Sequence, residues 1–271
     1  MPAAGEVTWE ATFKERRDGY LEFAGRLSRP DRGETIPGSF LLPDDWSGEV
    51  VLWFAPQGKS VLYGADGRPL PGVLQLVRSG AAVGSFDLFG QGEFVTAEDD
   101  FRTTRRVANP REAAAYTFGY NPSLAAQRAH DVLSAIGYVH HDRQHPAAER
   151  RLRVVGSGAC GPIVALALSQ ANGAVHEAWL DTDGFRFADV DDLHDPMFLP
   201  GGARYLDLPG FLALAAPTRL HLRGEAGELP EFVARIHGAS GSSVANERDL
   251  PALAPEVVVE VLQDAIGTPS R

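Results

Sequence analysis

Cysteine is nearly absent from this sequence: its 271 residues contain only one, Cys160. A single cysteine cannot form an internal disulfide bond, which fits a reducing compartment. Long hydrophobic runs are also absent, and none approaches the ~20 residues that a membrane-spanning helix needs. The stretch from Met1 to Glu10 has neither the basic region nor the apolar core of a secretory signal. We therefore expect a cytoplasmic protein without a membrane partner.

Positive charge is scarce as well. The chain has 25 lysines and arginines against 36 aspartates and glutamates, which gives a formal net charge of −11. No basic run is interleaved with aromatic residues, so nucleic acid is not an expected partner. What is present suits a globular chain: 44% of residues are hydrophobic and 23% are charged. The length is sufficient for one large α/β domain.

The order of the apolar runs predicts a parallel α/β sheet. Residues 1–19 are polar and mixed, and we expect them to form an N-terminal extension. Alternating residues at 20–27 and 35–42 predict an antiparallel hairpin at the sheet edge. From residue 49 the runs become continuously apolar, as in strands covered on both faces. Later strands are predicted at 50–54, 81–86, 153–155, 177–180, 219–222 and 256–262.

Helical segments separate these strands, at 70–77, 122–136, 163–168, 208–215 and 229–236. The alternation predicts an α/β fold: a three-layer sandwich with a doubly wound, mostly parallel sheet and an antiparallel start. We expect a single domain over 1–271, with residues 94–121 and 185–216 as loop or lid insertions. Residues 257–261 are expected to form an edge strand open to pairing with a second copy.

The stretch 151–168 is the most informative part of the chain. The β-prone residues 153–155 lead into Gly156, Gly158 and Gly161, which permit a sharp turn, and an apolar helical run follows. Ligands of open parallel sheets bind beyond the carboxyl ends of the strands. A strand, a glycine-rich turn and a helix in this order form the elbow that presents a nucleophile at that edge.

This elbow, together with the predicted sheet order, resembles the α/β-hydrolase superfamily, and the resemblance extends from Tyr20 onward. Four further segments are similar to its acetyl-xylan-esterase and dienelactone-hydrolase branch. They are residues 55–60, 80–93, 183–187 and 198–205. The resemblance implies the α/β-hydrolase fold and acyl transfer by a Ser-His-Asp triad.

The three positions that the resemblance assigns to the triad hold other residues. In the family elbow Val-Val-Gly-x-Ser-x-Gly-Gly-Pro-Ile, the serine falls on Gly158. The family acid, in a Gly-Glu-x-Asp pattern, falls on Gly227. The family histidine follows the last strand, and no histidine follows residues 256–262. Covalent acyl transfer needs a nucleophile and a base that activates it, so the resemblance implies a degenerate triad.

Other groups at the same edge are candidates for ligand binding. The backbone N–H groups of Gln57, Gly58 and Ala159 are expected to remain as donors of an oxyanion-type hole. Asp87 and Glu225 are expected to line the pocket. No metal-ligand spacing supports a metal site, and neither a metal nor another cofactor is predicted.

A relocated catalytic set is the alternative. Cys160 or Ser157 would be its nucleophile, His194 its base, and Asp181 or Asp183 its acid. Each also has a structural interpretation. A serine here can hydrogen-bond inside the turn, a buried cysteine can pack the helix against the strand, and aspartates often form turns. A histidine in an acidic loop is commonly exposed to solvent.

Two functions follow from this pattern. The first is a pseudo-esterase: an acetyl-xylan-esterase-like domain without the triad, which binds a small acyl or carbohydrate ligand or serves as a structural domain. In that role it would act as a homo-oligomer or beside a partner domain. The second is an active carboxylic-ester hydrolase with the relocated nucleophile. Turnover of an ester that disappears when that nucleophile is replaced would distinguish them.

Overall fold

The computed structural model describes residues 1–96, 101, 103–104, 117–141 and 150–267. Nine strands form one sheet in the order β1-β2-β3-β5-β4-β6-β7-β8-β9. In this order, the neighbouring pairs among β1, β2, β3 and β5 are antiparallel. From β5 through β4 to β9, each neighbouring pair is parallel. The strands are β1 (Thr8–Arg17), β2 (Tyr20–Arg29), β3 (Glu34–Pro43), β4 (Glu49–Phe54), β5 (Ala82–Phe86), β6 (Arg151–Gly156), β7 (Glu177–Asp181), β8 (Arg219–Arg223) and β9 (Val244–Asn246).

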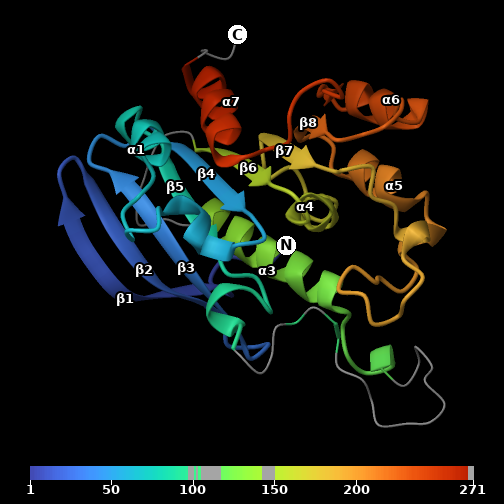
Figure 1. Ribbon diagram of the computed structural model, residues 1–271, viewed down its shortest axis with the longest axis horizontal. Helices are drawn as coiled ribbons and strands as arrows, with labels where there is room; N and C mark the ends of the chain where they lie inside the picture. Colours follow the sequence, from blue (N-terminus) through green and yellow to red (C-terminus); the bar gives the residue numbers. More distant parts are fainter. Residues whose placement is uncertain (97–100, 102, 105–116, 142–149, 268–271) are drawn as a thin grey trace.

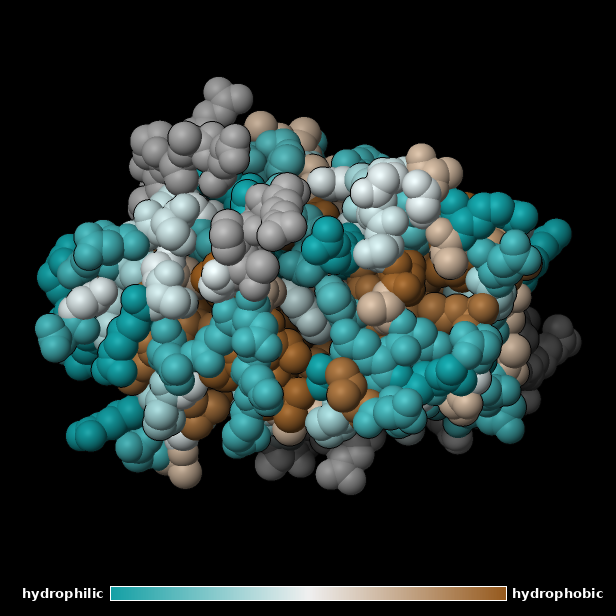
Figure 2. All heavy atoms as spheres, turned by 90° about the horizontal axis from the view of Figure 1, so that it is seen from above, coloured by the Kyte–Doolittle hydropathy of each residue, from teal (hydrophilic) through white to brown (hydrophobic). Residues whose placement is uncertain are grey.

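Helices cover both faces of this sheet (Figure 1). One face packs against α1 and α7, and the other packs against α3, α4, α5 and α6. The helices are α1 (Pro71–Arg78), α3 (Leu124–His141), α4 (Cys160–Leu168), α5 (Asp207–Leu214), α6 (Glu231–Ala239) and α7 (Pro255–Gly267). The predicted three-layer sandwich with an antiparallel start is confirmed. Seen from the side of α1 and α7, hydrophobic atoms show in patches between hydrophilic ones (Figure 2). Within the described ranges, no helix combines the length and apolar character needed to cross a bilayer.

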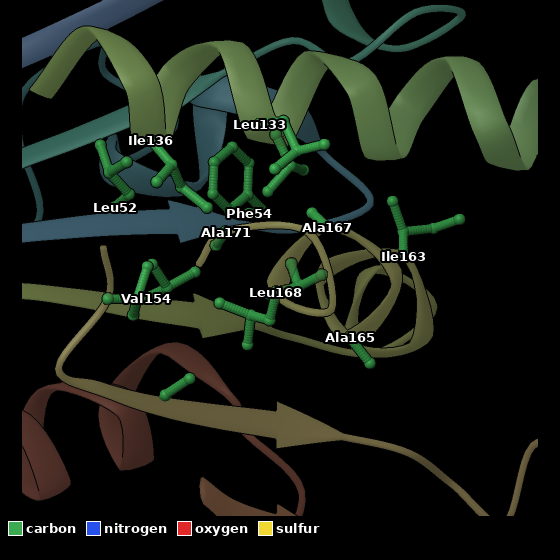
Figure 3. Close-up of a cluster of buried hydrophobic side chains, with 14 of the residues drawn as sticks. Leu52, Phe54, Leu133, Ile136, Val154, Ile163, Ala165, Ala167, Leu168 and Ala171 are labelled. Carbon is green, nitrogen blue, oxygen red and sulfur yellow. The ribbon is translucent and has the colours of Figure 1, made fainter. Parts of the chain in front are cut away.

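A hydrophobic core fixes the strands whose ends carry the candidate site. Leu52 and Phe54 of β4 pack with Ile136 of α3, and all three are fully buried (Figure 3). Ile163 and Leu168 of α4 lie in the same cluster. Burying each such side chain contributes about 1.5–3 kcal/mol. The helix that follows the elbow is therefore held against the sheet along its whole length.

The predicted N-terminal extension 1–19 contains an additional strand. β1 pairs along its length with β2, so the antiparallel start has three strands rather than two. Most of its side chains are exposed, but Trp9 packs against the aromatic rings of Phe23 and Phe40. Asp18-Gly19 supplies the missed signal, because Asp-Gly favours a tight hairpin turn and Gly19 has φ +83°.

The prediction of a last strand at 256–262 was wrong, and with it the expected edge strand at 257–261. These residues belong to α7, and the last strand is β9, which lies between the predicted helix 229–236 and residue 256. Successive valines favour a strand by intrinsic propensity. Tertiary packing overrides that propensity. Val258 and Leu262 lie four residues apart on the same side of α7, and both are fully buried.

Of the two predicted insertions, the structure describes all of 185–216 and a small part of 94–121. Residues 185–216 contain α5 and two short 3-10 helices, η3 (Phe187–Asp189) and η4 (Gly202–Arg204). The predicted insertion 94–121 lies mostly outside the described residues.

Candidate functional site

The elbow lies between β6 and α4, at the carboxyl edge of the parallel sheet. Gly158 and Ala159 are exposed at its tip, and Gly158 has φ +52°. A Cβ at Gly158 would lie 3.5 Å from Pro56 Cγ, an ordinary contact. Space for a side chain therefore exists at the tip, but glycine leaves it empty of any nucleophilic atom.

Ser157 points away from that tip. Its Oγ accepts a 2.7 Å hydrogen bond from Trp53 Nε1, and its N–H donates to the carbonyl of Phe54. Trp53 belongs to the core on the α1 and α7 face. The hydroxyl is therefore bonded to a side chain of β4 beneath the sheet edge, and not to a group inside the turn.

Cys160 lies in the core on the opposite face of the sheet, and it is 2% exposed. Its Sγ accepts a hydrogen bond from Gln91 Nε2 at 3.6 Å. Burial raises the pKa of the Cys160 thiol to about 11. Because the thiolate is the nucleophilic form, this thiol is unreactive at neutral pH. Among the described residues, no hydrogen bond joins a histidine to Cys160 or Ser157.

Asp181 connects the elbow with a distant loop. It is the last residue of β7 and is 5% exposed, and its carboxylate accepts the Gly158 N–H at 2.8 Å. The same carboxylate accepts the Leu253 N–H at 3.0 and 3.1 Å. Charge-assisted hydrogen bonds of this kind are stronger than neutral ones. The carboxylate thus fixes the backbone at the elbow tip and the backbone between β9 and α7.

The loop between β9 and α7 is where the resemblance places a histidine once β9 is recognised as the last strand. Residues 247–254 read Glu-Arg-Asp-Leu-Pro-Ala-Leu-Ala and contain none. Arg223 at the end of β8 holds this loop, because its Nη1 donates to the Pro251 carbonyl and its Nε pairs with Glu247 at 3.0 Å. The loop is therefore positioned by ionic contacts as well as by Asp181.

His221 extends this ionic group across the sheet. Its Nδ1 lies 2.9 Å from Glu247 and its Nε2 lies 3.0 Å from Glu177, while its ring stacks on Trp179 at 4.9 Å. Burial opposes a charge on the ring, but the hydrogen bonds with the two glutamates outweigh it and raise the pKa of His221. The imidazolium is the form that both carboxylates favour.

This arrangement predicts a pH-dependent contribution to stability. A raised folded-state pKa contributes stability below the unfolded-state pKa, and that stability is lost as pH rises through the folded-state pKa. We expect the wild type to lose on the order of 1 kcal/mol relative to His221→Gln as pH rises from about 6 to about 9. Urea denaturation of both proteins across that range measures it. A constant difference between them would contradict the prediction.

Asp87 follows β5, contacts the loop after β4, and is 1% exposed. Its carboxylate accepts the Lys59 N–H at 2.8 Å, the Lys59 Nζ at 2.5 Å and the Glu93 N–H at 3.0 Å. Lys59 Nζ also pairs with Glu93 at 2.5 Å. Asp87 therefore ties the loop after β4 to the loop after β5.

Two of the three expected oxyanion-type donors have no acceptor among the described residues. The Gly58 N–H donates to the Ala55 carbonyl at 2.9 Å, so it is taken. Within the described part of the chain, no acceptor bonds to the N–H groups of Gln57 or Ala159. Pro56, next to Gln57, lies against the elbow tip. The two free N–H groups belong to the loop after β4 and to the residue after the elbow glycine, the arrangement that typifies such a hole.

The remaining acidic candidates have different environments. Glu225 is 4% exposed, and both of its oxygens bond to Arg186, at 3.2 and 2.7 Å. This hydrogen-bonded pairing raises the pKa of Arg186. Asp183 is exposed and has φ +47°. Among the described residues, no cluster of three or more potential ligands could hold a metal ion.

His194 is buried rather than solvated, with 4% of its surface exposed. Its Nδ1 lies 3.4 Å from Thr104 Oγ1, and its backbone N–H donates to Asp192. Its Nε2 is buried without a hydrogen-bond partner among the described residues. Among the described residues, no hydrogen bond joins His194 to the elbow.

An open cleft of about 800 Å³ adjoins this edge. Lys59, Asp87 and Glu93 give it a charged side, while Tyr63 and Leu70 contribute apolar surface. Burial raises the pKa of Tyr63 to about 12, so its phenol is neutral. Volumes of this size suit small ligands. Sequence reasoning missed Lys59 and Tyr63, although both lie in or beside the family-like segment 55–60.

No protein-family model matches the sequence. No curated protein matches it either. Among solved structures, a promiscuous CE15 esterase from a marine bacterial metagenome aligns over 96% of this chain and 86% of its own, with 11% identity and a TM-score of 0.60. The chain has the α/β-hydrolase fold.

Other solved structures share this fold. The acylaminoacyl peptidase of Pyrococcus horikoshii aligns with a TM-score of 0.55 and 10% identity, over 96% of this chain and 49% of its own. At these identities the likeness establishes the fold, and membership of the acetyl-xylan-esterase-like branch stays a prediction from sequence.

Proposed function

We propose that this chain is a non-catalytic binding domain with the α/β-hydrolase fold, a pseudo-esterase. The observation that carries the proposal is the position of Asp181. Its carboxylate bonds to the N–H groups of Gly158 and Leu253, and so joins the elbow tip to the loop after β9. In a Ser-His-Asp enzyme those two places supply the nucleophile and the base. Here they are joined by a structural carboxylate.

Chemical reasons support the same proposal. A serine or cysteine nucleophile must reach the ligand and must have a base within hydrogen-bond distance. The Ser157 hydroxyl bonds to Trp53, and the Cys160 thiol is buried beside Gln91. Neither group lies at the exposed tip.

The binding role rests on groups that remain free. The N–H groups of Gln57 and Ala159 suit a carbonyl or carboxylate oxygen, as in an oxyanion hole. The adjoining cleft offers charged groups on one side and Tyr63 on the other. We propose a small acyl or carbohydrate ligand that places an oxygen at the two N–H groups. Binding there requires no covalent step.

One observation favours a second candidate, an ester hydrolase with a relocated base. His194 Nε2 is buried without a hydrogen-bond partner among the described residues, and a base needs a free ring nitrogen. Cys160 or Ser157 would then act as nucleophile after a rearrangement of the elbow.

Ester turnover separates the two candidates. We expect wild-type protein to hydrolyse p-nitrophenyl acetate and acetylated sugars no faster than buffer. Gly158→Ser should be equally inactive, because a serine at the tip would still lack a base, and activation by a base is worth about 10²–10⁴-fold. Cys160→Ala and Ser157→Ala serve as controls. Wild-type turnover that disappears in either control would refute the pseudo-esterase and support the hydrolase.

A further inference from the structure

The segment between β5 and η2 (Gly92–Phe94), residues 87–91, is held by α3 through the backbone of Phe89 and the carbonyl of Gly90. Asp131 Oδ2 of α3 accepts the Phe89 N–H at 2.8 Å. Arg128, one turn earlier on the same helix, donates from Nε to the Phe89 carbonyl at 2.9 Å. Both polar groups of Phe89 are thus bound by side chains of one helix, although its ring is 38% exposed.

The same segment covers the thiol beside the elbow. Gln91 Nε2 donates to Cys160 Sγ, and Gln91 Oε1 accepts the Leu88 N–H at 3.3 Å. Cys160 is the first residue of α4. Displacement of residues 87–91 would remove the cover from Cys160 and from Asp131 together.

Asp131 is an unusual residue for this position, because it is a carboxylic acid that is 3% exposed. Among the described residues, no lysine, arginine or histidine forms an ion pair with it. A buried carboxylate without a counter-ion is strongly disfavoured relative to one in water. Its charge is therefore easier to accommodate when the covering segment moves away and admits water.

The charged surroundings of Asp131 act in the same direction. Glu34 of β3 adds repulsion, though Glu34 is itself paired with His130 at 2.8 Å, and His130 contacts Arg29 of β2. Arg128 and the Phe89 N–H favour the ionised form, as does Gln127. Burial outweighs these three groups and raises the pKa of Asp131 to about 7.

We propose that Asp131 is a pH-sensitive latch for residues 87–91, which keeps this segment closed over Cys160 when neutral and favours its opening when ionised. The closed state holds the Asp131 proton more tightly than the open, hydrated state does. By linkage, the opening equilibrium rises by up to about tenfold per pH unit between the two pKa values and then levels off. The window runs from the ordinary range of an aspartate, near 4, to about 7.

Hydrogen exchange of the intact chain tests the latch. After correction for intrinsic exchange, protection of the Phe89 amide should fall by up to about 100-fold between pH 5 and pH 7. The amide of Val83, inside β5, is the internal reference. In Asp131→Asn, which keeps an acceptor oxygen but cannot ionise, protection should change by less than about threefold. Asp45→Asn, at an exposed aspartate, should behave as wild type.

The single cysteine gives a second readout. At each pH, the rate of Cys160 alkylation by iodoacetamide in wild type is divided by the rate in Asp131→Asn, which cancels the titration of the thiol. The ratio should rise with pH over the same window. A flat ratio, or equal pH dependence of Phe89 protection in both proteins, would overturn the proposal.

Wild-type protein alone decides the matter if Asp131→Asn does not fold. The ¹³Cγ resonance of Asp131 reports its titration directly. The proposal requires a titration midpoint well above that of an ordinary aspartate. Phe89 protection should decrease as the pH rises toward that midpoint and should level off once it is reached. A midpoint in the ordinary range of about 4 would overturn it.

Discussion

Gly161→Ala is expected to destabilise the fold by on the order of 4 kcal/mol. An alanine Cβ at this position would lie 1.7 Å from the carbonyl oxygen of Asp181, and 2.6 Å from its carbonyl carbon. These are backbone atoms at the end of β7, so no side-chain rotation can relieve the overlap. Either α4 must move away from β7 or the elbow must open. The loss should be seen as a lower urea midpoint with little change in slope.

Gly158→Ala is the matched control for this prediction. It makes the same chemical change three residues earlier, at the elbow tip, where the new Cβ meets only Pro56 at 3.5 Å. The positive φ of Gly158 should cost about 1 kcal/mol. Similar losses for the two variants would show that the close approach of Gly161 to β7 is not what holds the elbow together.

Asp181→Asn is the second large effect, an expected loss of about 2–3 kcal/mol. The carboxylate accepts hydrogen bonds from two backbone N–H groups, Gly158 and Leu253. An asparagine of the same size offers one acceptor oxygen, and its amide group would face a backbone donor. Because Oδ2 accepts from both N–H groups, the amide would replace Oδ1 and would face the Leu253 N–H as a second donor. Free energies of unfolding and exchange of those two amides measure the loss.

Asp183→Asn controls for this substitution. Asp183 is exposed, and asparagine tolerates its left-handed backbone conformation well. We expect a change within about 0.5 kcal/mol. Faster exchange at both Gly158 and Leu253 in Asp181→Asn alone would link the elbow and the β9–α7 loop energetically. Equal effects of the two substitutions would remove the central support for the pseudo-esterase proposal.

The two losses together bear on how the elbow is used. A catalytic elbow has to present a reactive side chain, whereas this one is fixed through its backbone. Gly161 permits close packing on β7, and Asp181 holds the N–H of Gly158. Both contacts are made by backbone groups at the elbow, and they contribute to its stability whichever side chain stands at the tip.

Local sequence determined the elbow and most of the sheet. Runs such as 50–54 and 219–222 are short, apolar and bounded by turn residues, so they predict strands without knowledge of the rest of the chain. The glycine at position 158 is also a property of the sequence alone. Together they indicated the α/β-hydrolase fold and the absence of a side chain at the elbow tip before any contact was known.

Tertiary structure decided the two ends of the chain. β1 is mostly exposed and pairs with β2. Its many charged residues give no strand pattern, so the sequence predicts residues 1–19 as an extension. α7 carries consecutive β-branched residues, yet packing of Val258 and Leu262 makes it a helix. In both places long-range contacts outweighed local preference.

Tertiary structure also decided the surroundings of the site residues. The partner of Ser157 is Trp53, 104 residues away, and the partner of Cys160 is Gln91, 69 residues away. Their residue types made Ser157 and Cys160 candidates for the nucleophile. Only the sheet topology shows that their side chains face opposite sides of the sheet, away from the tip. A hydroxyl or thiol has a reactivity set by its neighbours, and those neighbours come from other strands and loops.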